Sequence, residues 1–120
     1  MPGVRTRDRG LRFGNMHETS AQITVAAFQQ LIRDRYFKTD SARGTAGTFM
    51  WFVEEVGELS TSLMENAPER APTPEQKKNL GEEFADVFAW LCTLANINGV
   101  DIAAELRKYT DPERVKGVKS

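Results

Sequence analysis

The sequence has 120 residues, of which 40% are hydrophobic and 28% are charged, and its formal net charge at pH 7 is −1. This length predicts one small domain with a single core, and the balanced charge disfavours general binding to nucleic acid polymers or to anionic membranes. Cys92 is the only cysteine and His17 the only histidine, which disfavours a disulfide, a Cys/His zinc site and a Ser–His or Cys–His nucleophilic centre. Cys92 stands in an apolar run, and we interpret it as a core residue.

Residues 1–20 combine glycine and arginine with few apolar residues, and we interpret them as a mobile N-terminal arm. This stretch lacks the apolar segment of a secretory signal. The apolar run 87–97 has 11 residues, whereas a membrane-spanning helix needs about 20. We therefore expect a soluble cytoplasmic protein that has no membrane partner.

Two helices are predicted in the first half of the chain, over residues 22–36 and 47–66. The turn-rich residues 38–47 predict a loop between them. The second helix contains Gly57, which is unfavourable inside a helix and which a close helix contact could explain. The apolar positions that define the first helix by their spacing are Phe28, Leu31, Ile32 and Tyr36 or Phe37.

A third helix is predicted over residues 74–98, after a proline-rich connection at 67–73. Thr73 and Gln76 have the spacing of a capping box, and Pro74 takes the first helical position. The helix stops at an Asn-Gly pair, which commonly ends helices.

Asp101 can cap a fourth helix over residues 102–109, and residues 111–120 are a short C-terminal tail. No segment has the pattern of a strand. We therefore expect an all-α domain at residues 21–110, a four-helix bundle built around an antiparallel hairpin of the two long helices. A chain of this size would also gain stability from oligomerisation.

Each long helix has an apolar stripe that we take as the direction of the core. Glu55 lies at the edge of the first stripe and Glu58 about 60° further round, and Glu83 and Asp86 repeat this arrangement on the second helix. If the stripes pack together, these four carboxylates converge beside the seam, while Glu54 points further away. The stripes consist of Phe52, Val56, Leu59 and Leu63, and of Leu80, Phe84, Val87, Leu91 and Leu94.

These carboxylates have no cation nearby in the sequence. A solvated acidic face usually mixes charge signs at helical spacing, but residues 49–69 and 79–106 contain neither lysine nor arginine. A bound divalent cation is the simplest compensation, and carboxylate ligands without His or Cys suit Mg²⁺ or Mn²⁺. Trp51 and Trp90 share the flank of the acids, where they could stack on a base or pack in a core or subunit interface.

The acids form the motif E-x-x-E from Glu55 to Glu58, followed by E-x-x-D from Glu83 to Asp86 on the next helix. With the surrounding stretches ARGTAGTFMWFVEEVGEL and NLGEEFADVFAWLCTLANINGVDI, this pattern resembles the MazG-like all-α nucleoside triphosphate pyrophosphohydrolases. The resemblance covers about residues 22–110. It implies Mg²⁺-dependent cleavage of a nucleoside triphosphate between the α- and β-phosphates, which gives a monophosphate and pyrophosphate, and it suggests house-cleaning of non-canonical nucleotides.

Carried over residue by residue, the resemblance implies that Glu55, Glu58, Glu83 and Asp86 are the metal ligands. Glu54 and Glu55 are the candidate catalytic carboxylates, and Glu54 could orient water or hold a further metal. The general base stays unassigned between them. The resemblance also implies a homodimer or homotetramer, in which helices of one subunit complete the site of another.

The chain departs from the family pattern after the fourth predicted helix. Family members often carry K-x-x-x-N there, but no asparagine follows Lys108 at that spacing. Lys108 is the candidate phosphate contact, with Arg107 and Lys116 as alternatives, while Lys38 and Arg43 are more often plain surface charges. Two other functions stay open: a related pyrophosphohydrolase that acts on a phosphoribosyl-nucleotide, and a non-catalytic helical interaction module.

Overall fold

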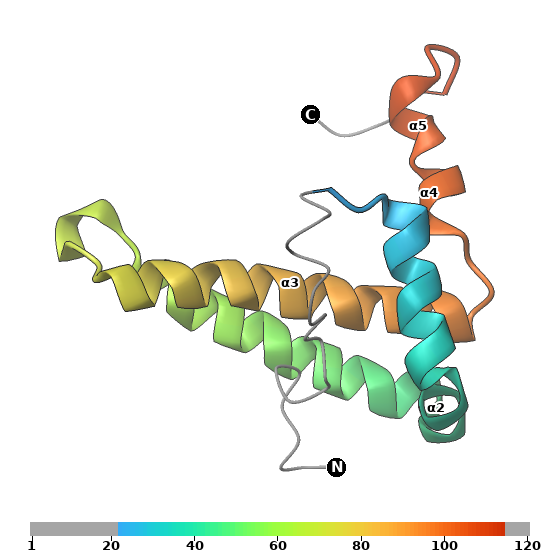
Figure 1. Cartoon of the computed structure of the whole chain (residues 1–120), viewed down its shortest axis with the longest axis horizontal. Coiled ribbons are helices and arrows are strands. Elements are labelled where there is room, and N and C mark those ends of the chain that lie inside the picture. The colour runs from blue at the N-terminus through green and yellow to red at the C-terminus, as the bar shows by residue number, and fades with distance from the viewer. Residues whose placement is uncertain (1–21, 115–120) are drawn as a thin grey trace.

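Figure 1 shows the computed structural model, which describes residues 22–114. This part of the chain is all-helical and contains no strand, as predicted. The predicted mobile arm, residues 1–20, and residues 115–120 of the predicted tail lie outside the described residues. The elements are α2 (Val25–Glu65), η2 (Pro68–Arg70), α3 (Pro74–Ile97), α4 (Ile102–Glu105) and α5 (Arg107–Thr110).

The longest element, α2, has a sharp bend at Gly44 where a loop was predicted. Helical structure continues on both sides of this residue, so the prediction of a loop over residues 38–47 was wrong. Gly44 has φ 84° and ψ 172°, a combination that is essentially restricted to glycine. One residue therefore supplies the change of direction. We call residues 25–43 the crossing segment, because they run across α3 in Figure 1.

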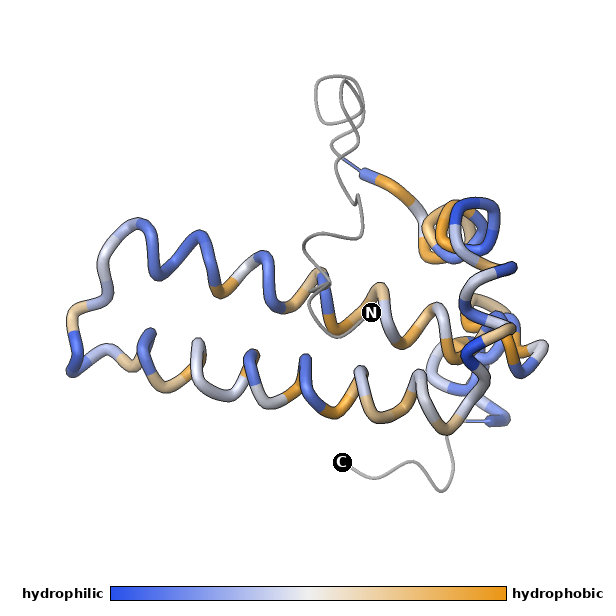
Figure 2. The backbone as a smooth tube through the Cα atoms, turned by 90° about the horizontal axis from the view of Figure 1, so that it is seen from below, coloured by the Kyte–Doolittle hydropathy of each residue, from blue (hydrophilic) through white to orange (hydrophobic). Residues whose placement is uncertain are grey.

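Residues 45–65 of α2 and the whole of α3 form the predicted antiparallel hairpin (Figure 1, Figure 2). The predicted capping box starts α3: Thr73 Oγ1 accepts the N–H of Gln76 at 3.1 Å, and Gln76 Oε1 accepts the N–H of Thr73 at 2.9 Å. Asn66 Nδ2 donates to the Gln76 carbonyl at 3.1 Å, across the connection between the helices. These bonds satisfy polar groups at the hairpin's closed end.

The crossing segment packs against the C-terminal half of α3. Ile32 is fully buried in one cluster with Ala89 and Cys92, and the rings of Phe28 and Phe88 stack with their centroids 5.7 Å apart. The predicted apolar spacing of the first helix is therefore confirmed. Cys92 is a buried core residue, as predicted.

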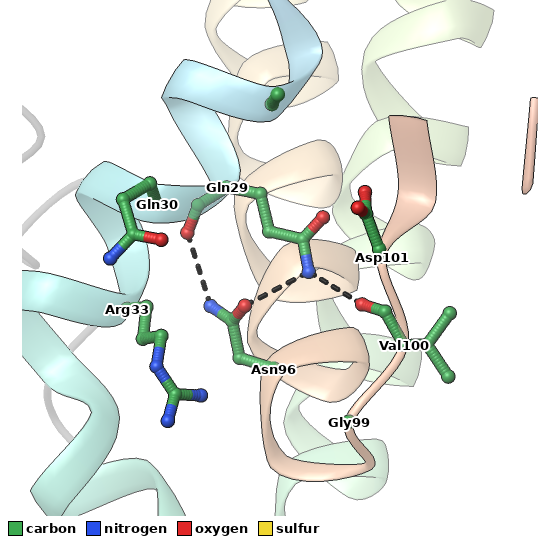
Figure 3. A pocket seen from close by; sticks show the side chains of 8 residues that line it. Gln29, Gln30, Arg33, Asn96, Gly99, Val100 and Asp101 are labelled. Carbon is green, nitrogen blue, oxygen red and sulfur yellow. Dashed lines mark hydrogen bonds between the residues drawn. The ribbon is translucent and has the colours of Figure 1, made fainter. Parts of the chain in front are cut away.

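A pair of amides fixes the crossing segment to the end of α3. Gln29 Nε2 donates to Asn96 Oδ1 at 2.9 Å and to the Val100 carbonyl at 2.7 Å. Asn96 Nδ2 donates back to the Gln29 carbonyl at 3.2 Å, and Gln29 Oε1 accepts the Ile102 N–H at 3.0 Å. Figure 3 shows these amides in the wall of a hollow of about 320 Å³. These hydrogen bonds use the polar groups of both amides within the fold, and they join the crossing segment to the end of α3.

The C-terminal part follows the predicted signals up to one interruption. Gly99, with φ 68°, follows α3, and Asp101 Oδ1 accepts the Ala104 N–H at 3.2 Å to cap α4. The helix predicted over 102–109 is divided into α4 and α5 at Leu106. Within the described chain, no single helix is long and apolar enough to cross a membrane, and α3 with the α4–α5 segment would be so only together, across a bend of 97°.

The apolar stripes of the hairpin do not face each other. Val56, Leu63, Phe84 and Leu91 are 40%, 47%, 54% and 41% exposed, so the prediction that the stripes form the seam was wrong. The helices meet through residues one position earlier, which lie about 100° around each helix. We call these residues the seam and the predicted stripes the outer stripes. The seam consists of Trp51, Glu55, Glu58 and Ser62 on α2, and of Asn79, Glu83, Asp86, Trp90 and Thr93 on α3.

Candidate functional site

The predicted metal ligands lie in the seam itself, and not beside it. Glu55 is 1% exposed, Glu83 is 2% exposed and Asp86 is 4% exposed, while Glu58 is half-buried. Glu82, the residue before Glu83 on α3, is exposed. The hairpin therefore buries carboxylates where a small protein normally buries Leu, Val or Ile.

Two sets of these carboxylates are close enough to hold an ion. Glu55, Glu83 and Asp86 form one buried group, whose ligand atoms lie within 4.8 Å of one another. Glu54, Glu55 and Glu58 form a second group by the same measure, and this group opens to solvent at Glu54. The structure thus brings all five predicted carboxylates together, with Glu55 common to both groups.

Glu55 gives the clearest sign that the site is built for a cation. Neither of its carboxylate oxygens has a hydrogen-bond partner within the described chain, although the side chain is fully buried. An ionised carboxylate in such a place costs several kcal/mol unless a positive charge compensates it. The part of the chain that the structure describes places no Lys or Arg in ion-pair contact with Glu55. The donor set therefore fits a bound metal ion.

The chemistry of the donors restricts which metal would fit. The atoms in both groups are carboxylate oxygens, which are hard ligands. Such sets suit Mg²⁺ and Mn²⁺, whereas zinc sites normally include histidine or cysteine. The residues present agree with a divalent cation of the predicted type.

The two tryptophans form the next layer along the seam. The rings of Trp51 and Trp90 stack at a centroid distance of 6.4 Å and an interplanar angle of 16°. Trp90 is fully buried, so of its two predicted roles this burial supports packing and not direct contact with a base. Trp51 is half-buried and lines a hollow of about 420 Å³ beside the acids. That hollow is lined by Arg43, Gly47, Met50, Trp51 and Glu54.

Arg43 is not the plain surface charge that the sequence suggested. Its Nη2 donates to Asp40, which is 2% exposed, in a short ion pair, and its Nε donates to the buried Thr48 Oγ1 at 3.4 Å. The guanidinium lies over the Trp90 ring, 5.0 Å from its centroid. Neither Asp40 nor Thr48 was predicted as a site residue: Asp40 lies in the predicted loop at 38–47, and Thr48 lies at the start of the helix predicted over 47–66. The glycines of RGTAG were the available signal.

The structure does not bring the predicted lysine to the acids. Lys108 is exposed on α5, with its Nζ 5.4 Å from the centroid of the Tyr109 ring. Helix α5 lies beyond the crossing segment, away from the middle of the hairpin (Figure 1). Arg107 is exposed on the same helix, Lys38 is exposed on the crossing segment, and Lys116 lies outside the described residues.

The hollow of Figure 3 does not belong to this site. It is lined by residues of the crossing segment and of the α3–α4 connection, and it shares no residue with either carboxylate group. The hollow beside Trp51 is lined in part by Glu54, which belongs to an acidic group, and it is therefore the hollow that adjoins the acids.

A family model described as the MazG nucleotide pyrophosphohydrolase domain matches residues 44–111, which include every predicted metal ligand. The search of curated proteins and the search of solved structures gave no significant match. The matched segment starts at the bend of α2 and covers the whole hairpin, α3 and the C-terminal helices. The chain therefore belongs to the MazG nucleotide pyrophosphohydrolase family.

Proposed function

We propose that the protein is a metal-dependent nucleotide pyrophosphohydrolase, which cleaves a nucleoside triphosphate between its α- and β-phosphates. The observation that carries this proposal is the buried carboxylate of Glu55, which belongs to both acidic groups and has no hydrogen bond within the described chain. A family of nucleotide pyrophosphohydrolases agrees with an acidic site, because metal ions join carboxylates to phosphate oxygens.

The two groups of carboxylates would hold two cations. Glu55, Glu83 and Asp86 would hold one divalent cation in the buried group, and Glu54 and Glu58 would share a second cation with Glu55. Bound Mg²⁺ or Mn²⁺ would offset the negative charge of the phosphates and lower the pKa of a coordinated water.

Glu54 is the carboxylate best placed to move a proton, since it is the exposed member of its group. In the proposed reaction, water oxygen bonds to a phosphorus of the α–β anhydride while the bridging P–O bond breaks. Glu54 takes the proton from the water. The products are a nucleoside monophosphate and pyrophosphate, and no nucleophilic side chain is needed.

The hollow beside Trp51 is the proposed place of the nucleoside. Its wall is mainly apolar, and it touches the acidic group at Glu54. A base could lie on the Trp51 ring while its phosphates reach the carboxylates. Lys108 is proposed to contact the phosphates bound at the site of another copy, because α5 lies away from the acids of its own chain.

A second copy of the chain is the proposed partner, and its contact surface is the pair of outer stripes. On α3, residues 88, 89, 92 and 96, which face the crossing segment, lie about 140° around the helix from its outer stripe. The crossing segment therefore leaves the stripes uncovered. Four of their side chains, Val56, Leu63, Phe84 and Leu91, are 40%, 47%, 54% and 41% exposed, and exposed apolar surface of this kind marks a protein interaction site.

Two hairpins joined through these stripes would make a four-helix bundle from two copies, whereas the sequence predicted such a bundle within one chain. Such an isologous contact is the commonest form of homo-oligomer. A homodimer is the proposed state, and a homotetramer would need a further surface.

The test is release of pyrophosphate from a panel of common and modified nucleoside triphosphates with Mg²⁺ or Mn²⁺. We expect activity that EDTA abolishes and that Glu58→Gln lowers at least about 100-fold. Preference for modified nucleotides would support house-cleaning in the cytoplasm. Turnover of phosphoribosyl-nucleotides alone would favour the related enzyme, and absence of both activity and metal binding would favour a helical interaction module.

A further inference from the structure

We propose that Asp40 and Arg43 are positioning residues, which hold the Trp90–Trp51 stack and thereby shape the hollow beside the carboxylates. Where it concerns activity, this inference rests on the proposed function. The spectroscopic part of its test does not. The segment that contains both residues was predicted to be a loop, and neither residue belongs to either carboxylate group.

Arg43 is held from two sides, by Asp40 and by Thr48. Its guanidinium donates two bonds to Asp40 Oδ1, one of them from Nη1 at 3.3 Å, and its Nε donates to Thr48 at 3.4 Å. Asp40 is 2% exposed and Thr48 is fully buried. A planar guanidinium bound in this way keeps one orientation, which a lysine could not reproduce.

Two glycines shape the backbone so that the Arg43 side chain can take this position. Gly44 bends α2 directly after Arg43, with the left-handed φ of 84°. A Cβ at Gly47 would come within 3.0 Å of Arg43 Cγ, so the missing side chain leaves room for the arginine stem. The two glycines of RGTAG therefore have separate purposes: one sets the bend and the other accommodates Arg43.

Arg43 is linked to the carboxylate site through the two tryptophans. The guanidinium lies 5.0 Å from the centroid of Trp90, and Trp90 stacks on Trp51 with a 16° interplanar angle. Trp90 follows Asp86 on α3 by four residues, and Trp51 precedes Glu55 on α2 by four residues. The stack is therefore the layer next to the carboxylates, and Arg43 lies against its Trp90 ring and also lines the hollow. Motion of Arg43 would change the Trp51 wall of the hollow but leave the ligands in place.

The experiment uses the full chain and compares Arg43→Met, Arg43→Lys and Asp40→Asn with the control Arg33→Met. Arg33 suits this purpose because it also lies over a ring, 3.9 Å from the centroid of Phe37, but lines the hollow of Figure 3, which shares no residue with either carboxylate group. Both tryptophans of the chain are in this stack, so circular dichroism at the long-wavelength edge of the near ultraviolet, where tyrosine and phenylalanine contribute little, gives a tryptophan band that reports on it.

We expect Arg43→Met and Asp40→Asn to lose most of that band, Arg43→Lys to restore only part of it, and Arg33→Met to keep it. In pyrophosphate release, the Arg43→Met variant should raise KM about tenfold and change kcat less than about threefold. Metal affinity should stay within about threefold of the wild-type value.

An unchanged tryptophan band in folded Arg43→Met, or a loss of kcat with KM unchanged, would overturn the proposal. If Arg43→Met does not fold, Asp40→Asn decides the question, because it removes the ion pair that orients the guanidinium while Arg43 stays in place. A normal band in that variant would count against the proposal. If the wild type releases no pyrophosphate, the proposed function fails, and the tryptophan band still tests the positioning role.

Discussion

The hairpin helices bury carboxylates on one side and expose apolar side chains on the other, which is the opposite of what most small proteins do. Glu55, Glu83 and Asp86 are buried between α2 and α3, while Phe84 and Leu91 are 54% and 41% exposed on the outside. The buried side needs positive charge and the exposed side needs an apolar partner. In the proposed function, a metal ion compensates the buried side and a second copy covers the exposed side. Each prediction below changes one side and leaves the other intact.

The largest effect is expected from changes to the seam. Asp86→Asn removes one charge of the buried group, so metal affinity should fall at least about tenfold and pyrophosphate release at least about 100-fold. Calorimetry with Mn²⁺ and the pyrophosphate assay measure the two effects. Glu82→Gln is the matched control on the same helix, and it should behave as the wild type because Glu82 is exposed and outside both groups. Equal losses in the two variants would show that overall acidity, and not the seam geometry, matters.

A smaller effect is expected from changes to the outer stripes. Placing lysines at Phe84 and Leu91 should weaken self-association by about 100-fold, because two charges would enter the apolar contact. Sedimentation velocity across a concentration series would show a shift to monomer. Met64→Lys is the control, since Met64 is 58% exposed but lies outside the stripes. A monomeric wild type, or a dimer that the double variant leaves unchanged, would refute the assigned surface.

The smallest effect separates the two kinds of glycine in α2. Gly44→Ala should lower the free energy of unfolding by about 1–3 kcal/mol, because alanine does not favour a φ of 84°. Gly57→Ala should raise it by up to about 1 kcal/mol, because the position is helical and no atom of the described chain lies within 4 Å of the added Cβ. Urea unfolding measures both. A destabilising Gly57→Ala would indicate that the second copy approaches the helix at this position.

The elements were predictable because their end signals are local. The Thr73–Gln76 capping box and the Asp101 cap form the bonds that the sequence predicted. The bend in α2 was not predictable in the same way, because a turn-rich composition fits both a loop and a kinked helix. Only the torsion angles of Gly44 distinguish them. Nor does the close helix contact suggested for Gly57 exist within the described chain.

The structure brings the predicted acidic residues together, although the predicted core of the hairpin was wrong. Motif spacing placed Glu55 and Glu58 on one helix and Glu83 and Asp86 on the next, and each pair does take part in an acidic group. The register was off by one residue, since apolar stripes were assumed to pack within one chain. A hydrophobic pattern shows which side of a helix avoids water, but it does not show whether the same chain or another copy covers it. Asp40 was not predicted, and Arg43 was predicted to be a plain surface charge, because their interactions depend on the bend.

The most direct test of the account is thermal unfolding of the wild type and Glu55→Gln, each with and without Mn²⁺. At a metal concentration about 100 times Kd, the wild type should gain roughly 10 °C in Tm, while Glu55→Gln should gain little. Without metal the order should reverse, because glutamine removes an uncompensated buried charge and the variant should melt above the wild type. A wild type whose Tm ignores Mn²⁺, or a Glu55→Gln variant that gains as much as the wild type, would contradict the central claim that the seam is built around a bound cation.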